Sequence, residues 1–175
     1  MTLTPLLDAA LIVQIHVAFA IPALLIGPFA IFMRTSWRAH KIVGYCWVVA
    51  MAGLSITALF IPSHSLAVVG HLGPIHLFSV FGLWGITNGI WLATQGRIAE
   101  HRMALKWTWF GAMGAASLAN FIPGRTINQM VFGEPSAAGW GVIALGAVAL
   151  VSLWQRDRGN LRYRTNVQSR HAQAA

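Results

Sequence analysis

Residues 40–55 read HKIVGYCWVVAMAGLS and residues 101–117 read HRMALKWTWFGAMGAAS, so one apolar pattern follows two separate histidine–cation pairs. An Ile-His dipeptide precedes each stretch, at 15–16 and at 75–76, with its histidine 24 residues before the first pair and 25 before the second. Self-similarity at one spacing indicates a duplicated structural unit. The sequence therefore predicts two copies of a hairpin, each made of two hydrophobic helices with a histidine near each end.

The composition is that of a membrane protein. Hydrophobic residues make up 57% of the 175 residues and charged residues only 9%, which is not typical of a soluble domain of this size. Crossing a bilayer takes about 20 residues of helix. We therefore expect an all-α integral membrane protein with five spans, at residues 8–33, 41–62, 72–95, 103–123 and 138–154.

The spans are expected to form a single membrane domain over residues 1–175. Residues 8–62 make the first repeat and 72–123 the second, which together give a duplicated four-helix core. Residues 138–154 contain no histidine and lie outside the duplication, so we expect a fifth transmembrane helix that packs on the core or contacts a partner. Residues 155–175 are predicted to be a polar, basic tail.

Positive charges lie mainly on one side of the predicted membrane. The net charge of +8 is concentrated between the first two spans, between the third and fourth, and after the fifth. The opposite loops are nearly neutral, because 62–71 has no Lys or Arg and 124–137 has only Arg125. The positive-inside rule then places the N-terminus outside and the C-terminus in the cytoplasm. The charge thus indicates orientation and gives no reason to expect a nucleic-acid partner.

Four histidines fall in two layers of the predicted core. His16 and His76 lie inside spans one and three toward the outer face, while His40 and His101 begin spans two and four at the cytoplasmic face. An ionisable residue within a span is costly and marks a functional site by default. Bis-histidine haem b takes one axial nitrogen from each of two helices. We therefore expect two b haems, with His16/His76 as the outer pair of iron ligands and His40/His101 as the inner pair.

Neighbouring residues suit a porphyrin and its propionates. Ala20, Ala23 and Gly27 follow His16 along one face of its helix, and Gly44 follows His40 by one turn, so small side chains leave room for a flat plate. Four cations are candidate propionate partners, three near the inner pair and one near the outer pair: Arg38, Lys41, Arg102 and Arg125.

Other interpretations of these residues stay open at this point. Small residues along a membrane helix also serve helix packing, and His40 and His101 could instead hydrogen-bond a carbonyl or a lipid headgroup. The histidines could also contact another metal or a quinone. His64 and His71 suggest an alternative outer site for Cu or Zn.

At these residues the chain resembles a bacterial family of predicted membrane proteins without assigned function, number 2306 among the domains of unknown function. The likeness covers about residues 10–126 and leaves the fifth helix and the tail outside. It implies a multi-pass protein of the bacterial inner (plasma) membrane and supplies no activity. The matching positions are His16 with the Ala-rich helix after it, Gly27-Pro28-Phe29, Arg34, His40-Lys41, Gly44, His101-Arg102 and Arg125.

More distantly, the chain is similar to the di-haem b-type transmembrane cytochromes of the ascorbate- and ferric-reductase kind. They also have a four-helix core with one histidine per helix, paired between helices one and three and between two and four. The similarity implies a membrane oxidoreductase or electron carrier that passes electrons across the bilayer, with a quinone or another redox partner. Two alternatives remain: an accessory or assembly subunit of a larger respiratory or photosynthetic complex, and a small transporter or metal-handling protein.

Overall fold

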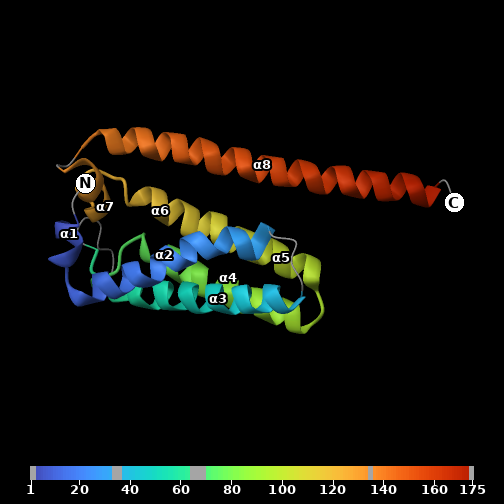
Figure 1. The fold of residues 1–175 in the computed structure, drawn as a ribbon, viewed down its shortest axis with the longest axis horizontal. Helices are drawn as coiled ribbons and strands as arrows, with labels where there is room; N and C mark the ends of the chain where they lie inside the picture. Colours follow the sequence, from blue (N-terminus) through green and yellow to red (C-terminus); the bar gives the residue numbers. More distant parts are fainter. Residues whose placement is uncertain (1–2, 33–36, 64–69, 134–135, 174–175) are drawn as a thin grey trace.

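The protein is a bundle of helices (Figure 1). The computed structural model describes residues 3–32, 37–63, 70–133 and 136–173. Within these ranges every element is a helix and none is a β-strand. The predicted all-α fold class is therefore confirmed.

Four of the described helices are long and apolar enough to cross a membrane. Their limits agree with four of the predicted spans to within a few residues at most ends, because a continuous apolar run of this length has few other stable conformations in lipid. The four helices are α2 (Leu11–Phe32), α3 (Trp37–Leu59), α4 (His76–Thr94) and the first half of α8 (Ala138–Gln173).

The predicted span at 103–123 is built differently. Three short helical segments follow one another along one rod: α5 (Ile98–Trp107), the π-helix η1 (Thr108–Gly114) and α6 (Ala115–Ala119). A π-helix bonds each N–H to the carbonyl five residues back, so it holds more residues per turn than an α-helix. Apolar composition does not encode this choice of hydrogen bond. A span at 103–123, and with it the total of five spans, is thus not confirmed, and neither is the duplication of the hairpins; both stay predictions.

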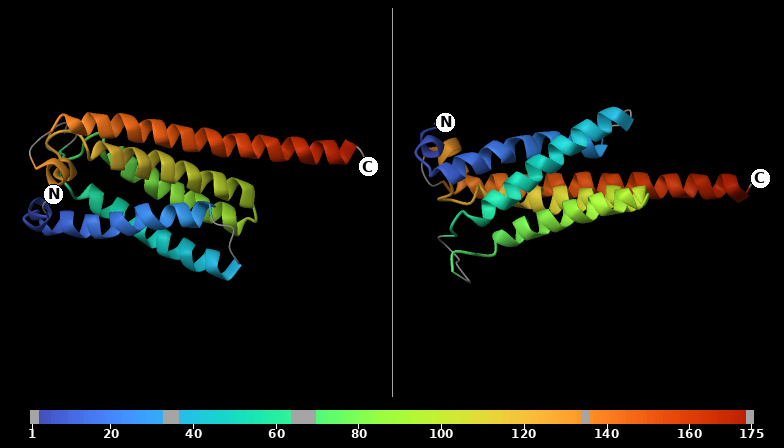
Figure 2. Two further views of the ribbon diagram at one scale, coloured as in Figure 1. Left: turned by 45° about the horizontal axis from the view of Figure 1, so that its top comes forward. Right: turned by 90° about the horizontal axis from the view of Figure 1, so that it is seen from below.

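The core is filled mainly by large side chains of α3. Trp47 is fully buried and Met51 nearly so, between Ala23 of α2, Ile86 of α4 and Met113 of η1. Helix α3 packs against α2 on one side and α4 on the other, and α4 packs against α5 and η1. Helix α8 lies outside this core along α6 (Figure 2).

Small residues on α4 allow the close approach of its neighbours. A methyl group at Gly82 would meet the hydroxyl oxygen of Ser55, and one at Gly85 would collide with Thr108. The glycines of this face are therefore occupied by packing contacts, as small residues in membrane helices commonly are.

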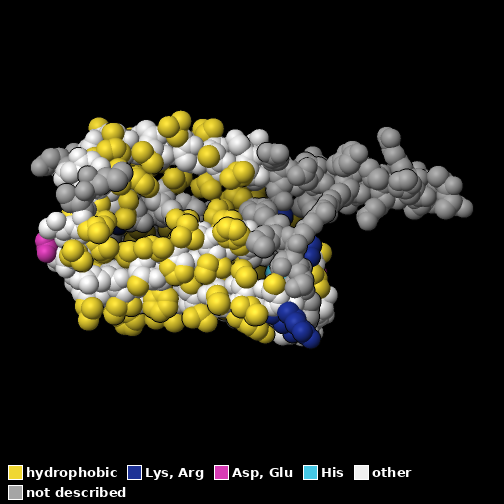
Figure 3. All heavy atoms as spheres, in the orientation of Figure 1, with side chains coloured by type: hydrophobic (Ala, Val, Ile, Leu, Met, Phe, Trp, Pro, Cys, Tyr) yellow, Lys and Arg dark blue, Asp and Glu magenta, His cyan; other side chains and the backbone are white. Residues whose placement is uncertain are grey.

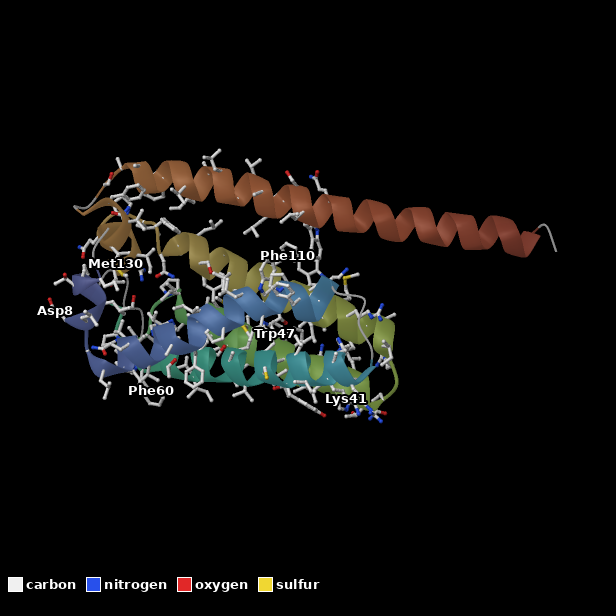
Figure 4. The ribbon with its side chains drawn as sticks, in the orientation of Figure 1. Asp8, Lys41, Trp47, Phe60, Phe110 and Met130 are labelled. Carbon is white, nitrogen blue, oxygen red and sulfur yellow. The ribbon has the colours of Figure 1, made fainter. Side chains whose placement is uncertain are left out.

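The two ends of the bundle differ in charge (Figure 3). We call the end that carries Arg38, Lys41, Arg97 and Arg102 the basic end. The opposite end, here the loop end, contains α1 (Thr4–Leu7), α7 (Thr126–Phe132) and the connection between α3 and α4. Lys41 and Asp8 lie at these opposite ends in Figure 4. The charge separation is thus along the bundle axis, and the side of the membrane that each end faces stays a prediction.

Helix α8 runs well past the basic end (Figures 1 and 2). Its 36 residues correspond to about 54 Å of helix, and the apolar, span-length part stops at Gln155. The backbone of the predicted polar tail at 155–175 therefore continues as helix to Gln173.

The sides of the bundle are covered by exposed apolar side chains (Figure 3). Leu25 of α2, Trp84 of α4 and Leu145 of α8 are each more than half exposed. Contiguous apolar surface of this extent is characteristic of helices that face lipid. The described part of the chain therefore has the surface of a membrane protein in a bilayer.

Candidate functional site

Two of the predicted ligands come together at the basic end. His40 lies in the first turn of α3 and His101 in the first turn of α5, and their ring centroids are 6.4 Å apart with the planes at 85°. The charge of Arg102 is also close enough to act on His40 electrostatically. The turn between α4 and α5 thus brings a histidine–arginine pair to the beginning of α3.

The hydrogen bonding of His101 leaves one nitrogen available. Its Nδ1 lies 2.8 Å from the carbonyl oxygen of Gly89. Because a carbonyl only accepts, Nδ1 carries the proton, and the neutral ring keeps its lone pair on Nε2. Metal-bound histidines are commonly oriented by such a bond from the second nitrogen. His40 makes no hydrogen bond with the described part of the chain.

The separation of the two rings suits a shared metal ion. Imidazole nitrogens bind metals at about 2 Å, so two rings on opposite sides of one ion have their centres about 6 Å apart. His40 and His101 are at 6.4 Å. One turn after His40, a methyl group built on Gly44 would meet no atom within 4 Å, so there is open space beside the pair.

Several cations surround the pair. Arg38, Lys41 and Arg102 were expected here as propionate partners, and all three belong to the basic end and are exposed. Lys106, one helical turn after Arg102 on α5, is only 9% exposed.

For the other predicted pair, the described residues show hydrogen bonds to α3 and its following loop and no contact between the two rings. His16, on α2, places Nδ1 3.1 Å from the hydroxyl oxygen of Thr57 on α3. The Thr57 hydroxyl lies 2.7 Å from the carbonyl oxygen of Gly53, to which it donates, so it accepts a hydrogen bond from the Nδ1–H of His16. His16 therefore joins α2 to α3.

His76 is held by the loop between α3 and α4. It is 5% exposed, and its Nε2 lies 3.0 Å from the carbonyl oxygen of Ile61. Its Nδ1 lies 2.9 Å from the amide nitrogen and 3.1 Å from the carbonyl oxygen of Gly73. The neutral ring accepts from that amide and the protonated ring donates to that carbonyl. In either state both nitrogens are used, and neither has a lone pair for iron.

The alternative outer site divides between described and undescribed residues. The ring of His71 lies 6.3 Å from that of His76, and its Nε2 donates to the carbonyl oxygen of Leu59 at 3.1 Å. His64 lies outside the described residues. In the described ranges no group of three His, Cys, Asp or Glu side chains is placed to hold a metal ion.

The small residues after His16 are not open to a porphyrin. A methyl group on Gly27 would collide with the indole of Trp109 and approach that of Trp47. Trp47 also donates from Nε1 to the carbonyl oxygen of Ala23 at 3.0 Å. Two tryptophans therefore fill this face of α2. Arg125, the expected cation of the outer pair, lies at the start of α7 and forms no ion pair with the described residues.

These features define a multi-helix membrane protein with a histidine pair at one end. Residues 13–155 match DUF2306, a family of predicted membrane proteins, and the chain belongs to this family. The match extends through the apolar half of α8, which corrects the expectation that the likeness ends near residue 126. No curated protein and no solved structure matches the chain. The family establishes a membrane protein and names no activity.

Proposed function

We propose that the chain is a b-type haem protein of the bacterial inner membrane that relays electrons, with one haem held by His40 and His101. The observation that supports this most directly is the approach of these two rings from α3 and α5 to 6.4 Å. His101 has the lone pair and the Nδ1 anchor that an axial ligand needs.

The residues around the pair each have a role in this proposal. The bound haem supplies a one-electron redox centre. The bond from His101 to Gly89 fixes the orientation of the imidazole. Arg38, Lys41 and Arg102 neutralise the propionates, and the open side of Gly44 admits the edge of the plate.

The proposal includes one haem in place of the two that the histidine pattern suggested. A second haem on His16 and His76 would require His76 to give up its bonds to Ile61 and Gly73. It would also require Trp47 to leave Ala23. These hydrogen bonds are buried or partly buried, and breaking several together is unfavourable.

The positive-inside rule places the basic end, and hence the proposed haem, at the cytoplasmic face. A quinone in the bilayer or a cytoplasmic redox protein is then within reach of the haem edge. Transfer across the whole membrane would need a second centre, supplied by a partner.

Absorption spectra of the protein, expressed with ample haem and solubilised in detergent, test the proposal. We expect a Soret band and one haem per chain, lost in His40→Ala and in His101→Ala. His16→Ala, which removes one hydrogen bond, is the matched control and should keep the band. A colourless wild-type protein would refute haem binding, and loss of the band in His16→Ala but not in the His40 and His101 variants would refute this assignment of ligands.

A further inference from the structure

Asn88 is a polar side chain within α4 that has no hydrogen-bond partner in the described part of the chain. The other asparagines whose side chains are described do have partners. Asn120 donates to the carbonyl oxygen of Ala116 at 3.1 Å, and Asn128 bonds Phe121 and Ser136. Asn88 is therefore an exception that calls for a physical explanation.

The depth of Asn88 makes this exception costly. It lies 12 residues after His76 and six before Thr94, the two ends of α4. At 1.5 Å per residue this is about 18 Å from one end of the helix and about 9 Å from the other. The amide carries two donor hydrogens and an acceptor oxygen. No water is available in the hydrocarbon region to satisfy them.

Asn88 is half-buried at the edge of the packed face of α4, because Gly85 and Leu92 on one side of it are buried. Trp84 and Trp91, one turn before and after it, are 61% and 52% exposed. The adjoining face of α4, which includes Gly82, Gly85 and Gly89, is already buried against α3, α5 and η1. The described part of the chain therefore supplies no hydrogen-bond partner for Asn88, and its side toward Trp84 and Trp91 is open to one from another chain.

We propose that Trp84, Asn88 and Trp91 form a dimer interface with a second copy of the chain. An amide is complementary to another amide, because each oxygen can accept a hydrogen bond from the NH₂ group of the other. A two-fold axis beside α4 brings Asn88 of both copies together and satisfies both at once. The two tryptophans cover the amide pair on either side. Trp84, Asn88 and Trp91 are themselves uncharged, and the guanidinium of Arg97 lies 5.9 Å from the ring of Trp91 at the basic end of this surface.

Cysteine cross-linking in native membranes tests the interface. Gln95 is exposed, lies two turns from Asn88 on the same face, and stands just after α4. In a Cys46→Ser background, Gln95→Cys should cross-link to a product of twice the 19.0 kDa chain mass. The wild-type chain, whose Cys46 is exposed on α3, is the matched control and should not cross-link.

The role of the amide is tested by adding Asn88→Leu to the Gln95→Cys protein. Interhelical hydrogen bonds in membranes contribute modestly, so dimer affinity in detergent should fall about three- to twentyfold. Asn120→Leu, which removes an amide bonded within its own helix, should leave affinity unchanged. A monomeric product from Gln95→Cys, a product of another mass, or an equal effect of both leucine variants would overturn the proposal. Haem content does not enter this test.

Discussion

The two histidine pairs occupy similar sequence contexts and differ in what their nitrogens do. At the loop end His76 uses both nitrogens on backbone groups, and His16 bonds Thr57. At the basic end His101 uses one nitrogen, and His40 makes no hydrogen bond with the described residues. In the first pair His76 has no nitrogen left for a ligand and His16 keeps one, whereas in the second pair both histidines keep a lone pair that a ligand could use.

The small residues near each pair show the same contrast. Gly27, on the helix of His16, is covered by Trp47 and Trp109, while Gly44, on the helix of His40, faces open space. A glycine in a membrane helix thus marks close packing in one case and a vacant surface in the other. The sequence alone does not distinguish these two kinds of glycine, but substitutions at the two ends of the bundle do.

His76→Ala is expected to have the largest effect on stability. It removes a buried ring and leaves the carbonyl of Ile61 and the amide of Gly73 without their partner. The loss should be about 2–4 kcal/mol, measured as a lower midpoint of thermal unfolding in detergent. His71→Ala, at an exposed ring, is the control and should cost less than about 1 kcal/mol. Equal losses would contradict a structural role specific to His76.

Gly27→Ala is expected to have the next largest effect on stability. The new methyl group would collide with Trp109 and force one indole to move. Overpacking of this kind costs about 1–3 kcal/mol. Thermal unfolding should show the loss, with the fluorescence of the displaced tryptophan shifted. An unchanged midpoint would mean that the contact between α2 and the two indoles is not close.

Gly44→Ala should have the smallest effect on stability and the opposite sign. The methyl group meets nothing within 4 Å, and alanine favours helix over glycine by up to about 1 kcal/mol. The haem-free protein should therefore be slightly more stable. If Gly44 borders the proposed haem, the same variant should bind haem more weakly in titrations. Unaltered haem affinity would show that the haem does not lie beside Gly44.

Much of the fold follows from hydrophobicity, and the exceptions have physical causes. The lengths of α2, α3, α4 and the apolar half of α8 could be predicted because a bilayer fixes the length of an apolar helix. The division of 103–123 into α- and π-helical segments could not be predicted, since the same apolar residues suit either kind of turn. The dimensions of the bilayer constrain where a helix ends and say little about its internal geometry.

The site was predictable only in part for a similar reason. Spacing placed His40 and His101 near one end of the bundle, where the structure brings them together. Spacing also suggested that His16 and His76 face each other, but it does not report the rotation of a helix about its axis. The two rings bond Thr57 and Ile61, contacts between residues 41 and 15 positions apart that no local pattern encodes.

The π-helical stretch has a consequence for the outermost helix. Leu150 of α8 lies against Gly114, and Gly146 faces Leu118 of α6. Each residue added to or removed from a helix turns everything after it by about 100°. Shortening the 108–114 segment by one residue would rotate Leu118 away from Gly146 and detach the two glycine contacts together. The packing of α8 thus depends on how far the preceding helix is rotated about its axis. The 108–114 segment therefore tolerates substitution more readily than a change of length.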